Sequence, residues 1–438
     1  MTKVLDDQGH VSRIQLLAPL RLRDFRLLWT GMTLSLLGDG VLLVALAWQA
    51  YQLSNRPAAM SLVGVALTVP QVILVLFGGV VSDRLERRKV MLVADVVRGV
   101  ALGALAWLTF SGALAMWHLV AFAAVYGAAS AFFMPAFEAL VPSIVPEEEL
   151  VEANALDQFV RPAALWLLGP ALGGALIGWA GTGCAFALDA ASFAVSAGCL
   201  LRLTRTAPGE DTGEDTGENA GENTGPMTVR SAVLEMREGL AFVRREPWLW
   251  ATLAAASLTY LLFLGPTEVL LPYVVKNELG GDAHDVGLIL ASGGVAAVAA
   301  ALVIGQTGLP KRRMTFTYVV WALATLGVAG YGIAGSRWQA MLAGALIAGF
   351  EALGAVAWMT TKQRLIPEGL MGRVSSFDWF ISIALVPVSY AVTAPIADAF
   401  GVRETLIGAG VLGALVTSGF LFLPGVRTPD RSTSAVPA

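Results

Sequence analysis

Three carboxylates lie deep inside long apolar stretches of the sequence. Asp39 lies near the middle of the first stretch, Glu268 follows Pro266 in the seventh, and Glu351 lies midway along the tenth. A charge buried in a bilayer is costly unless it is paired or faces water, so such residues are candidates for function. They could bind a proton or a cationic substrate. For Asp39, a hydrogen bond to a neighbouring helix is an equally good explanation.

Other ionisable residues in the apolar stretches are spaced so that an acid and a base share one helix face. They predict two structural ion pairs, Asp157 with Arg161 and Asp95 with Arg98. Asp189 and Asp378 have no such partner in sequence, and their roles stay open.

Aromatic and amide side chains in the same stretches could line a cavity for a hydrophobic cargo, because aromatic rings stack and adapt to apolar ligands. The candidates are Trp48, Gln49, Tyr51, Tyr260, Phe263, Trp358 and Trp379.

The stretches that position these residues are long enough to cross a bilayer. The 438 residues are 56% hydrophobic and 14% charged, with a mean hydropathy of +0.68, whereas soluble domains have about 25% charged residues. A hydrocarbon core about 30 Å thick needs roughly 20 apolar residues per helix, and its backbone must be paired. The sequence therefore predicts an all-α membrane protein. The twelve expected transmembrane helices are 25–53, 59–82, 90–110, 115–140, 153–180, 182–203, 247–275, 284–308, 314–334, 338–363, 372–400 and 403–424.

Basic residues fall mostly on one side of these helices, as in the cytoplasmic loops of membrane proteins. With the N-terminus inside, few of the 29 Lys and Arg residues lie elsewhere: four external (Arg56, Lys276, Arg337, Arg403) and two within helices (Arg98, Arg161). This distribution predicts a multi-pass protein of the cell membrane with both termini cytoplasmic. The net charge of −4 gives no reason to expect a nucleic-acid partner.

The region between the sixth and seventh helices differs in composition. Residues 209–224 hold four tandem Gly-Glu units without a large apolar residue, which predicts a disordered acidic linker. Apolar residues then recur at helical spacing from Val229 to Val243, which predicts an amphipathic surface helix or an extension of the seventh helix. The expected divisions are an N-terminal cytoplasmic segment (1–24), a six-helix bundle (25–203), a cytoplasmic linker (204–245), a second six-helix bundle (246–424) and a cytoplasmic tail (425–438).

The two halves of the sequence repeat at a common offset of 221 residues, by which Val145, Pro146, Asp157 and Phe159 fall on Ile366, Pro367, Asp378 and Phe380. Weak internal symmetry is expected of transporters built from two halves with the substrate site between them. The repeat predicts two pseudo-symmetric six-helix bundles.

The segment between the second and third helices reads Gly78-Gly79-Val80-Val81-Ser82-Asp83-Arg84-Leu85-Glu86-Arg87-Arg88-Lys89. With Gly79, Asp83, Arg84, Arg87 and Arg88, it resembles the GxxxDRxGRR signature loop of the major facilitator superfamily, with Glu86 in place of a glycine. The resemblance implies the major facilitator fold and says nothing about the substrate.

Further segments are similar to the bacterial enterobactin-exporter and macrolide-efflux group, among them Asp24-Phe25-Arg26-Leu27-Leu28-Trp29, Gly38-Asp39 and Phe133-Met134-Pro135-Ala136. In the fifth helix, Gly169, Pro170, Gly173 and Gly174 resemble the core of the drug/proton antiporter motif. The glycines upstream of that core are replaced by Leu156 and Leu165. Small residues permit close helix contact, and Pro170 can bend the helix.

The resemblance implies a monomeric secondary transporter that exports small hydrophobic compounds, drug-like, macrolide-like or siderophore-like, by alternating access and proton antiport, and so a link to multidrug resistance. No cofactor, metal or catalytic residue is expected. The sequence shows no Asp-rich or HExxH motif of an intramembrane enzyme and no phosphate-binding loop of an ATP-driven pump. A lipid or lysolipid flippase, a nutrient importer of the same fold and a non-transporting receptor are the alternatives.

Overall fold

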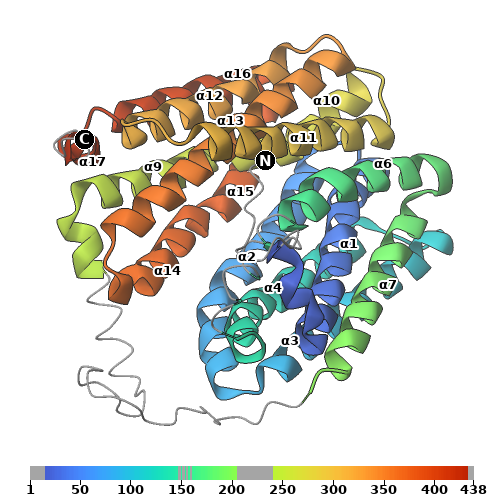
Figure 1. Cartoon of the computed structure of the whole chain (residues 1–438). Helices are drawn as coiled ribbons and strands as arrows, with labels where there is room; N and C mark the ends of the chain where they lie inside the picture. Colours follow the sequence, from blue (N-terminus) through green and yellow to red (C-terminus); the bar gives the residue numbers. More distant parts are fainter. Residues whose placement is uncertain are drawn as a thin grey trace, which may run out of the picture. The chain divides into compact units, whose positions relative to one another are not determined.

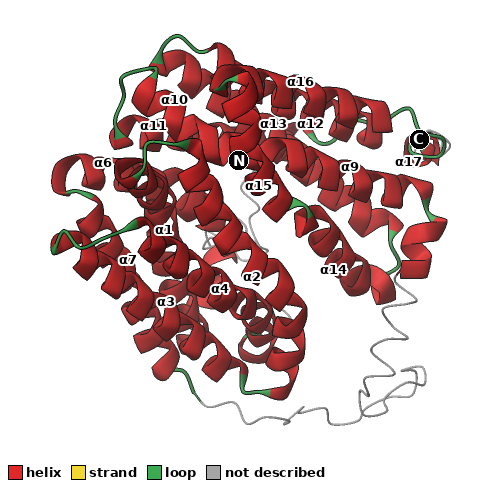
Figure 2. Ribbon diagram, turned by 180° about the vertical axis from the view of Figure 1, so that it is seen from behind, coloured by secondary structure: helices red, strands yellow, loops and turns green. Residues whose placement is uncertain are grey.

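The structure, a computed structural model, describes residues 15–146, 149, 153, 156–157, 160–204 and 240–432. Every regular element in these ranges is a helix, as Figures 1 and 2 show. The predicted acidic linker, the predicted surface helix before residue 240 and both chain ends lie outside the described residues.

Each half of the chain is a succession of helices. The first half contains the 3-10 helix η1 (Gln15–Arg21) and then α1 (Arg23–Leu53), α2 (Pro57–Arg84), α3 (Arg87–Phe110), α4 (Met116–Ile144), the π-helix η3 (Ala163–Leu168), α6 (Gly169–Ala180) and α7 (Thr182–Leu201). The second half contains α9 (Pro247–Gly265), the π-helix η4 (Pro266–Leu270), α10 (Leu271–Asn277), α11 (Ala283–Thr307), α12 (Arg313–Ile333), α13 (Arg337–Leu365), α14 (Glu368–Ala384), α15 (Val386–Phe400), α16 (Val402–Phe420) and α17 (Thr428–Ser432).

Eleven helical stretches in the described part of the chain are long and apolar enough to cross a membrane. The twelfth expected span, 403–424, coincides with α16, a 19-residue helix with charged residues in its first turn. The predicted signature loop is shorter than expected, because α2 continues to Arg84 and α3 begins at Arg87. The membrane-spanning helical architecture predicted from composition is confirmed.

The described residues form two compact units. Unit 1 comprises those within 1–59, 66–208 and 281–291, and unit 2 comprises those within 60–65, 209–280 and 292–438. In unit 1, α3 packs along α4 and α7, and α7 packs along α1. In unit 2, α12 packs in the same way along α13 and α16, and α16 packs along α9. Each half thus repeats one packing scheme, as the internal repeat of the sequence predicts.

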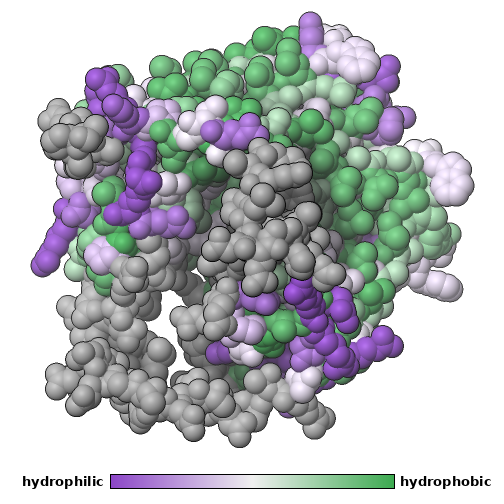
Figure 3. All heavy atoms as spheres, viewed as in Figure 1, coloured by the Kyte–Doolittle hydropathy of each residue, from purple (hydrophilic) through white to green (hydrophobic). Residues whose placement is uncertain are grey.

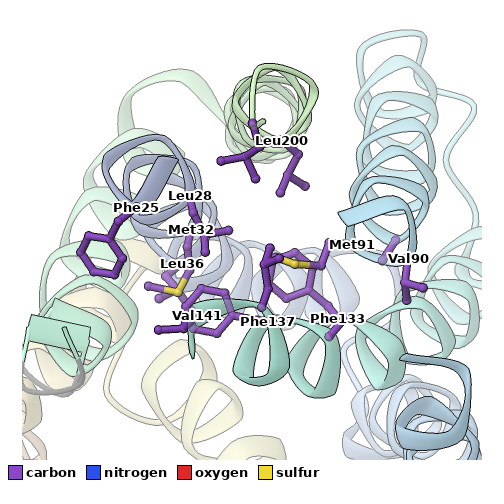
Figure 4. Packing of buried hydrophobic residues seen from close by; sticks show 14 of the residues in the cluster. Phe25, Leu28, Met32, Leu36, Val90, Met91, Phe133, Phe137, Val141 and Leu200 are labelled. Atoms are coloured by element: carbon purple, nitrogen blue, oxygen red, sulfur yellow. The ribbon is translucent and has the colours of Figure 1, made fainter. Parts of the chain in front are cut away.

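The core of unit 1 is built from the inward faces of α1, α3, α4 and α7. Figure 4 shows Met91 of α3 directed toward Phe133 and Phe137 of α4, and the two phenyl rings stack with their centroids 6.4 Å apart. Close packing of such side chains holds helices together in lipid, where water does not drive association.

The core of unit 2 contains three tryptophans from three helices. The ring of Trp358 lies 6.0 Å from that of Trp248 and 6.2 Å from that of Trp321, measured between centroids. The outward faces of the helices remain apolar. In Figure 3, hydrophobic side chains cover the face of α12 and α16, and hydrophilic ones gather toward the helix ends near α17. This distribution is the one expected of helices surrounded by lipid.

Two of the spans contain a π-helical turn next to a proline. In the fifth span η3 leads into Gly169 and Pro170, and in the seventh span η4 begins at Pro266 and contains Glu268. Proline cannot donate the hydrogen bond of a regular helix, and a wider π turn redistributes the freed carbonyls. Such turns often occur at functional sites, so both spans are candidates for movement or binding.

Candidate functional site

Asp39 accepts a hydrogen bond from Tyr126. The carboxylate lies midway along α1, and the Tyr126 hydroxyl of α4 donates to its Oδ1 atom. Asp39 is partly exposed, whereas its neighbours Gly38 and Gly40 are buried. The hydroxyl therefore takes the place of water as the hydrogen-bond donor to one carboxylate oxygen. The Asp39 side chain nevertheless remains partly exposed. The tyrosine was not among the predicted site residues.

Arg98 occupies the centre of unit 1. Its Nη2 atom donates to Asp95 Oδ1 at 2.5 Å, and Ser196 Oγ of α7 donates to Asp95 Oδ2 at 2.6 Å. The Arg98 guanidinium carbon also lies 4.4 Å from the ring centroid of Phe193 and 4.5 Å from that of Phe133. An ion pair, a hydroxyl and two aromatic faces thus offset the burial of this charge. Asp95 and Arg98 thus form an ion pair, and its role as structural support stays a prediction.

Asp189 of α7 is fully buried on the same side of unit 1. Its Oδ1 lies 3.0 Å from Ser192 Oγ, and its Oδ2 has no hydrogen-bond partner within the described residues. The carboxyl packs directly against Gly38 of α1, where a side chain on residue 38 would overlap Oδ1. The sequence left the role of Asp189 open. Ser192 and Ser196 follow Asp189 by three and seven residues. This spacing puts the three side chains on one face of the helix, so it could have predicted a polar face there.

Asp157 and Arg161 form the second predicted ion pair. Arg161 Nη2 lies 3.2 Å from Asp157 Oδ1, and Arg161 also contacts the sulfur atoms of Met134 and Met32. Both charged side chains are partly exposed, so this pair is more accessible to water than Asp95 and Arg98. The role of the pair as structural support remains a prediction.

Glu268 has an environment similar to that of Asp39. It lies in the π turn η4, and the Tyr390 hydroxyl of α15 donates a hydrogen bond to its Oε2 atom. Ser389 lies next to Tyr390, and its hydroxyl accepts from the backbone N–H of Gly265, the last residue of α9, at 2.8 Å. These contacts tie the π turn and the residue before it to α15. Each half of the chain thus has one intramembrane carboxylate bonded to a tyrosine of another helix.

Glu351 is partly buried midway along α13, as its position in the sequence predicts. A different acid of unit 2, Asp378 of α14, has the ion partner that the sequence did not indicate. Lys362 Nζ forms an ion pair with Asp378 Oδ2, and Trp358 Nε1 donates to the same oxygen at 3.1 Å. Only 4% of Lys362 is exposed. The distribution of basic residues in the sequence had assigned it to the cytoplasmic side.

The predicted cavity residues have different surroundings. Tyr51 is fully buried, and Gln49 is buried and accepts a hydrogen bond from the Thr182 hydroxyl. Trp358 belongs to the tryptophan core of unit 2, whereas 64% of Trp379 is exposed. Trp48, Tyr260 and Phe263 are partly exposed. The last three have both an apolar surface and some accessibility, as a binding surface requires.

The glycines of the predicted antiporter-like motif bring the fifth span against α1. A Cβ atom on Gly169 would stand 2.6 Å from the Gly40 Cα atom, and one on Gly173 would stand 3.0 Å from Val41. Only residues without side chains permit this contact. Gly40 follows Asp39 directly, so the motif packs beside the candidate carboxylate.

Part of the signature segment is described. Arg88 donates to the Leu201 carbonyl at the end of α7 at 2.8 Å, a contact that satisfies a free carbonyl and suits the negative end of the helix dipole. Lys89 Nζ lies 2.7 Å from Oε2 of Glu86, the residue that replaces the usual glycine. The burial and side-chain contacts of Gly79, Asp83 and Arg84 lie outside what the structure describes.

Comparison with known proteins supports a transporter. Residues 14–435 match the family model described as transmembrane secretion effector. An uncharacterized MFS-type transporter, YfiS of Bacillus subtilis, is 24% identical over 92% of this chain and 93% of its own length. Macrolide efflux protein A of Streptococcus pyogenes is 23% identical over 89% and 93%. The multidrug efflux pump Tap of Mycolicibacterium fortuitum is 27% identical over 90% and 94%.

The fold also matches solved structures. The nucleoside transporter NupG superposes with a TM-score of 0.67 at 11% identity, over 93% of this chain and 99% of its own. A bacterial homologue of the iron transporter ferroportin, in an inward-facing state, gives 0.65 at 17% identity, over 92% and 99%. The predicted fold and family are therefore confirmed: the chain is a multi-pass membrane transporter of the major facilitator superfamily and belongs to its transmembrane secretion effector family.

Proposed function

We propose that this transporter exports small hydrophobic compounds across the cell membrane by proton antiport. The observation that carries the proposal is a tyrosine-bonded carboxylate within the membrane in each half, Asp39 with Tyr126 and Glu268 with Tyr390. Relatives named for macrolide and multidrug efflux align along nearly the whole chain, which favours export over import.

The proposed mechanism couples protonation to alternating access. A proton arriving from outside binds Asp39 or Glu268 and removes the charge that the tyrosine hydroxyl stabilises. For the proton to drive export, proton and cargo must favour different states of the transporter. Glu351 supplies a third carboxylate, for a second proton or a cationic cargo. The π turns and Pro170 provide the flexible points that the exchange of states requires.

The cargo class follows from the available surface. Trp48, Tyr260 and Phe263 offer aromatic faces that stack on apolar ligands without demanding one ligand shape. A compound with apolar rings, drug-like, macrolide-like or siderophore-like, suits such a surface. The transporter would work as a monomer of two six-helix halves, 25–203 and 246–424, with both termini in the cytoplasm.

The test is transport by the purified protein in proteoliposomes that contain a pH-sensitive dye. A proton gradient is imposed, and macrolides, cationic dyes and siderophores are added one at a time. We expect one class of compound to trigger proton movement, and Asp39→Asn or Glu268→Gln to abolish it. Asp398→Asn is the matched control, because this acid is exposed near the end of α15.

Three other results would each overturn part of the proposal. Compounds that cross without moving protons would leave a uniporter or a lipid flippase and remove the coupling. Tight binding without transport would indicate a receptor. Coupled movement only in the inward direction would indicate a nutrient importer.

A further inference from the structure

The interior of unit 1 contains more negative than positive charge if all its acids are ionised. Among the described residues, Asp95 of α3 is ion-paired with Arg98, and Asp39 of α1 and Asp189 of α7 both interact electrostatically with the same guanidinium. The neighbouring base, Arg161, is already paired with Asp157. Three carboxylates and one arginine would leave two net negative charges among the membrane-spanning helices, which is unfavourable. This imbalance favours protonation of at least one of the three acids.

The acids form one connected cluster. Tyr126 donates to Asp39, and its ring lies 5.8 Å from the Arg98 guanidinium and 6.2 Å from the ring of Phe193. Phe193 follows Ser192, the hydroxyl partner of Asp189, and Asp189 packs against Gly38 beside Asp39. The protonation of one acid is therefore coupled to that of the others.

The hydrogen bonds distinguish which acid holds the proton. Asp95 receives a donor on each oxygen, from Arg98 and Ser196, so its ionised form is satisfied. Asp189 has Ser192 as its hydroxyl neighbour, but Ser192 Oγ also lies 2.8 Å from the Asp189 backbone carbonyl. A serine has one proton to donate, and a carboxylic acid proton on Asp189 would supply the second. The other oxygen, Oδ2, is buried and has no partner within the described residues, which suits a neutral acid.

We propose that unit 1 contains a two-proton site, in which Asp189 holds a resident proton and the partly exposed Asp39 exchanges a second. With only Asp189 protonated, the cluster has one net negative charge, on Asp39. A proton that binds Asp39 makes the whole cluster neutral, while the Asp95 and Arg98 pair stays ionised in both forms. The exchangeable proton rests on the proposed antiport function, whereas the resident proton does not.

Infrared difference spectroscopy of the purified full-length protein in lipid tests the resident proton without transport. We expect the carbonyl stretching band of a protonated acid at neutral pH in the wild type, its loss in Asp189→Asn, and its retention in the exposed control Asp398→Asn. As the pH falls, a second band should grow in the wild type and be absent in Asp39→Asn. Identical wild-type and Asp189→Asn spectra would overturn the inference.

Thermal unfolding supplies a second readout. Asn is close in shape and charge to a neutral Asp189, so Asp189→Asn should lower the unfolding midpoint less than Asp95→Asn, which leaves Arg98 without its ion partner. An equal or larger decrease for Asp189→Asn would mean that Asp189 is ionised, and would overturn the inference. If the resident band appears while Asp39→Asn still couples proton movement to cargo, the antiport role of Asp39 fails but the resident proton stands.

Discussion

Lys362 is a buried lysine of unit 2 that is ion-paired with Asp378. The contribution of this ion pair to the stability of the protein is testable. Asp378→Asn would leave the Lys362 ammonium group buried without a counter-charge, which typically costs about 3–5 kcal/mol. We expect a loss of that size in the free energy of unfolding, measured by denaturant titration in detergent micelles. Glu278→Gln is the control. Its partner Arg403 is about one-third exposed, and such surface pairs contribute about 0–1 kcal/mol. Equal losses would show that Lys362 reaches water in solution.

At this scale, the sequence drew attention to the intramembrane acids but not to their partners. Asp39, Glu268 and Glu351 are candidates because a charge in an apolar stretch is conspicuous without any knowledge of packing. Tyr126, Tyr390 and Lys362 were missed, because tyrosine is common in apolar helices and a lysine near a helix end is usually solvated. Whether such a side chain points inward depends on the rotation of its helix, which only tertiary contacts determine.

Between neighbouring helices, the closest contact beside the candidate site joins α1 to the fifth span. Gly169→Ala would place a methyl group 2.6 Å from the Gly40 Cα atom, so the backbones would have to separate. Overpacking of this kind typically costs about 1–3 kcal/mol. We expect a lower thermal unfolding midpoint and less monodisperse protein in size-exclusion chromatography. Gly198→Ala is the control, because its added methyl would meet nothing within 4 Å. Equal behaviour of the two variants would show that the contact is loose.

Helix positions were predicted well because long apolar stretches can only be spanning helices, and the predicted motif at 169–174 does make a close contact. The π turns at Ala163–Leu168 and Pro266–Leu270 were not predicted. A π turn changes the helical phase, and phase is visible in a sequence only when one face is polar. These spans are apolar on nearly all sides, so the prolines were the only signal in the sequence. A proline predicts a bend in the helix, but it does not predict that the bend contains a π turn.

Across the whole chain, the repeat at an offset of 221 residues predicted two related halves, and the packing of α3 with α4 and α7 recurs as that of α12 with α13 and α16. The acid of the repeat is preserved as Asp157 and Asp378, but its base is not. Arg161 lies four residues after Asp157 on the same span, whereas Lys362 comes from the preceding helix. The repeat thus keeps an ion-paired acid at this position while the base comes from a different helix, which the aligned sequences alone do not reveal.

Orientation in the membrane is the last property that basic residues predict, and it is directly measurable. In a chain whose free cysteines Cys184 and Cys199 are replaced by serine, single cysteines are introduced as Arg56→Cys and Lys89→Cys. Both positions are exposed; residue 56 directly precedes α2, and residue 89 lies in the first turn of α3, just beyond the other end of α2. Because Lys and Arg are retained on the cytoplasmic side, a membrane-impermeant maleimide should label residue 56 in intact cells, and residue 89 only after permeabilisation. The reverse pattern would place both termini outside, and the proposed direction of proton entry through Asp39 would have to be reversed with it.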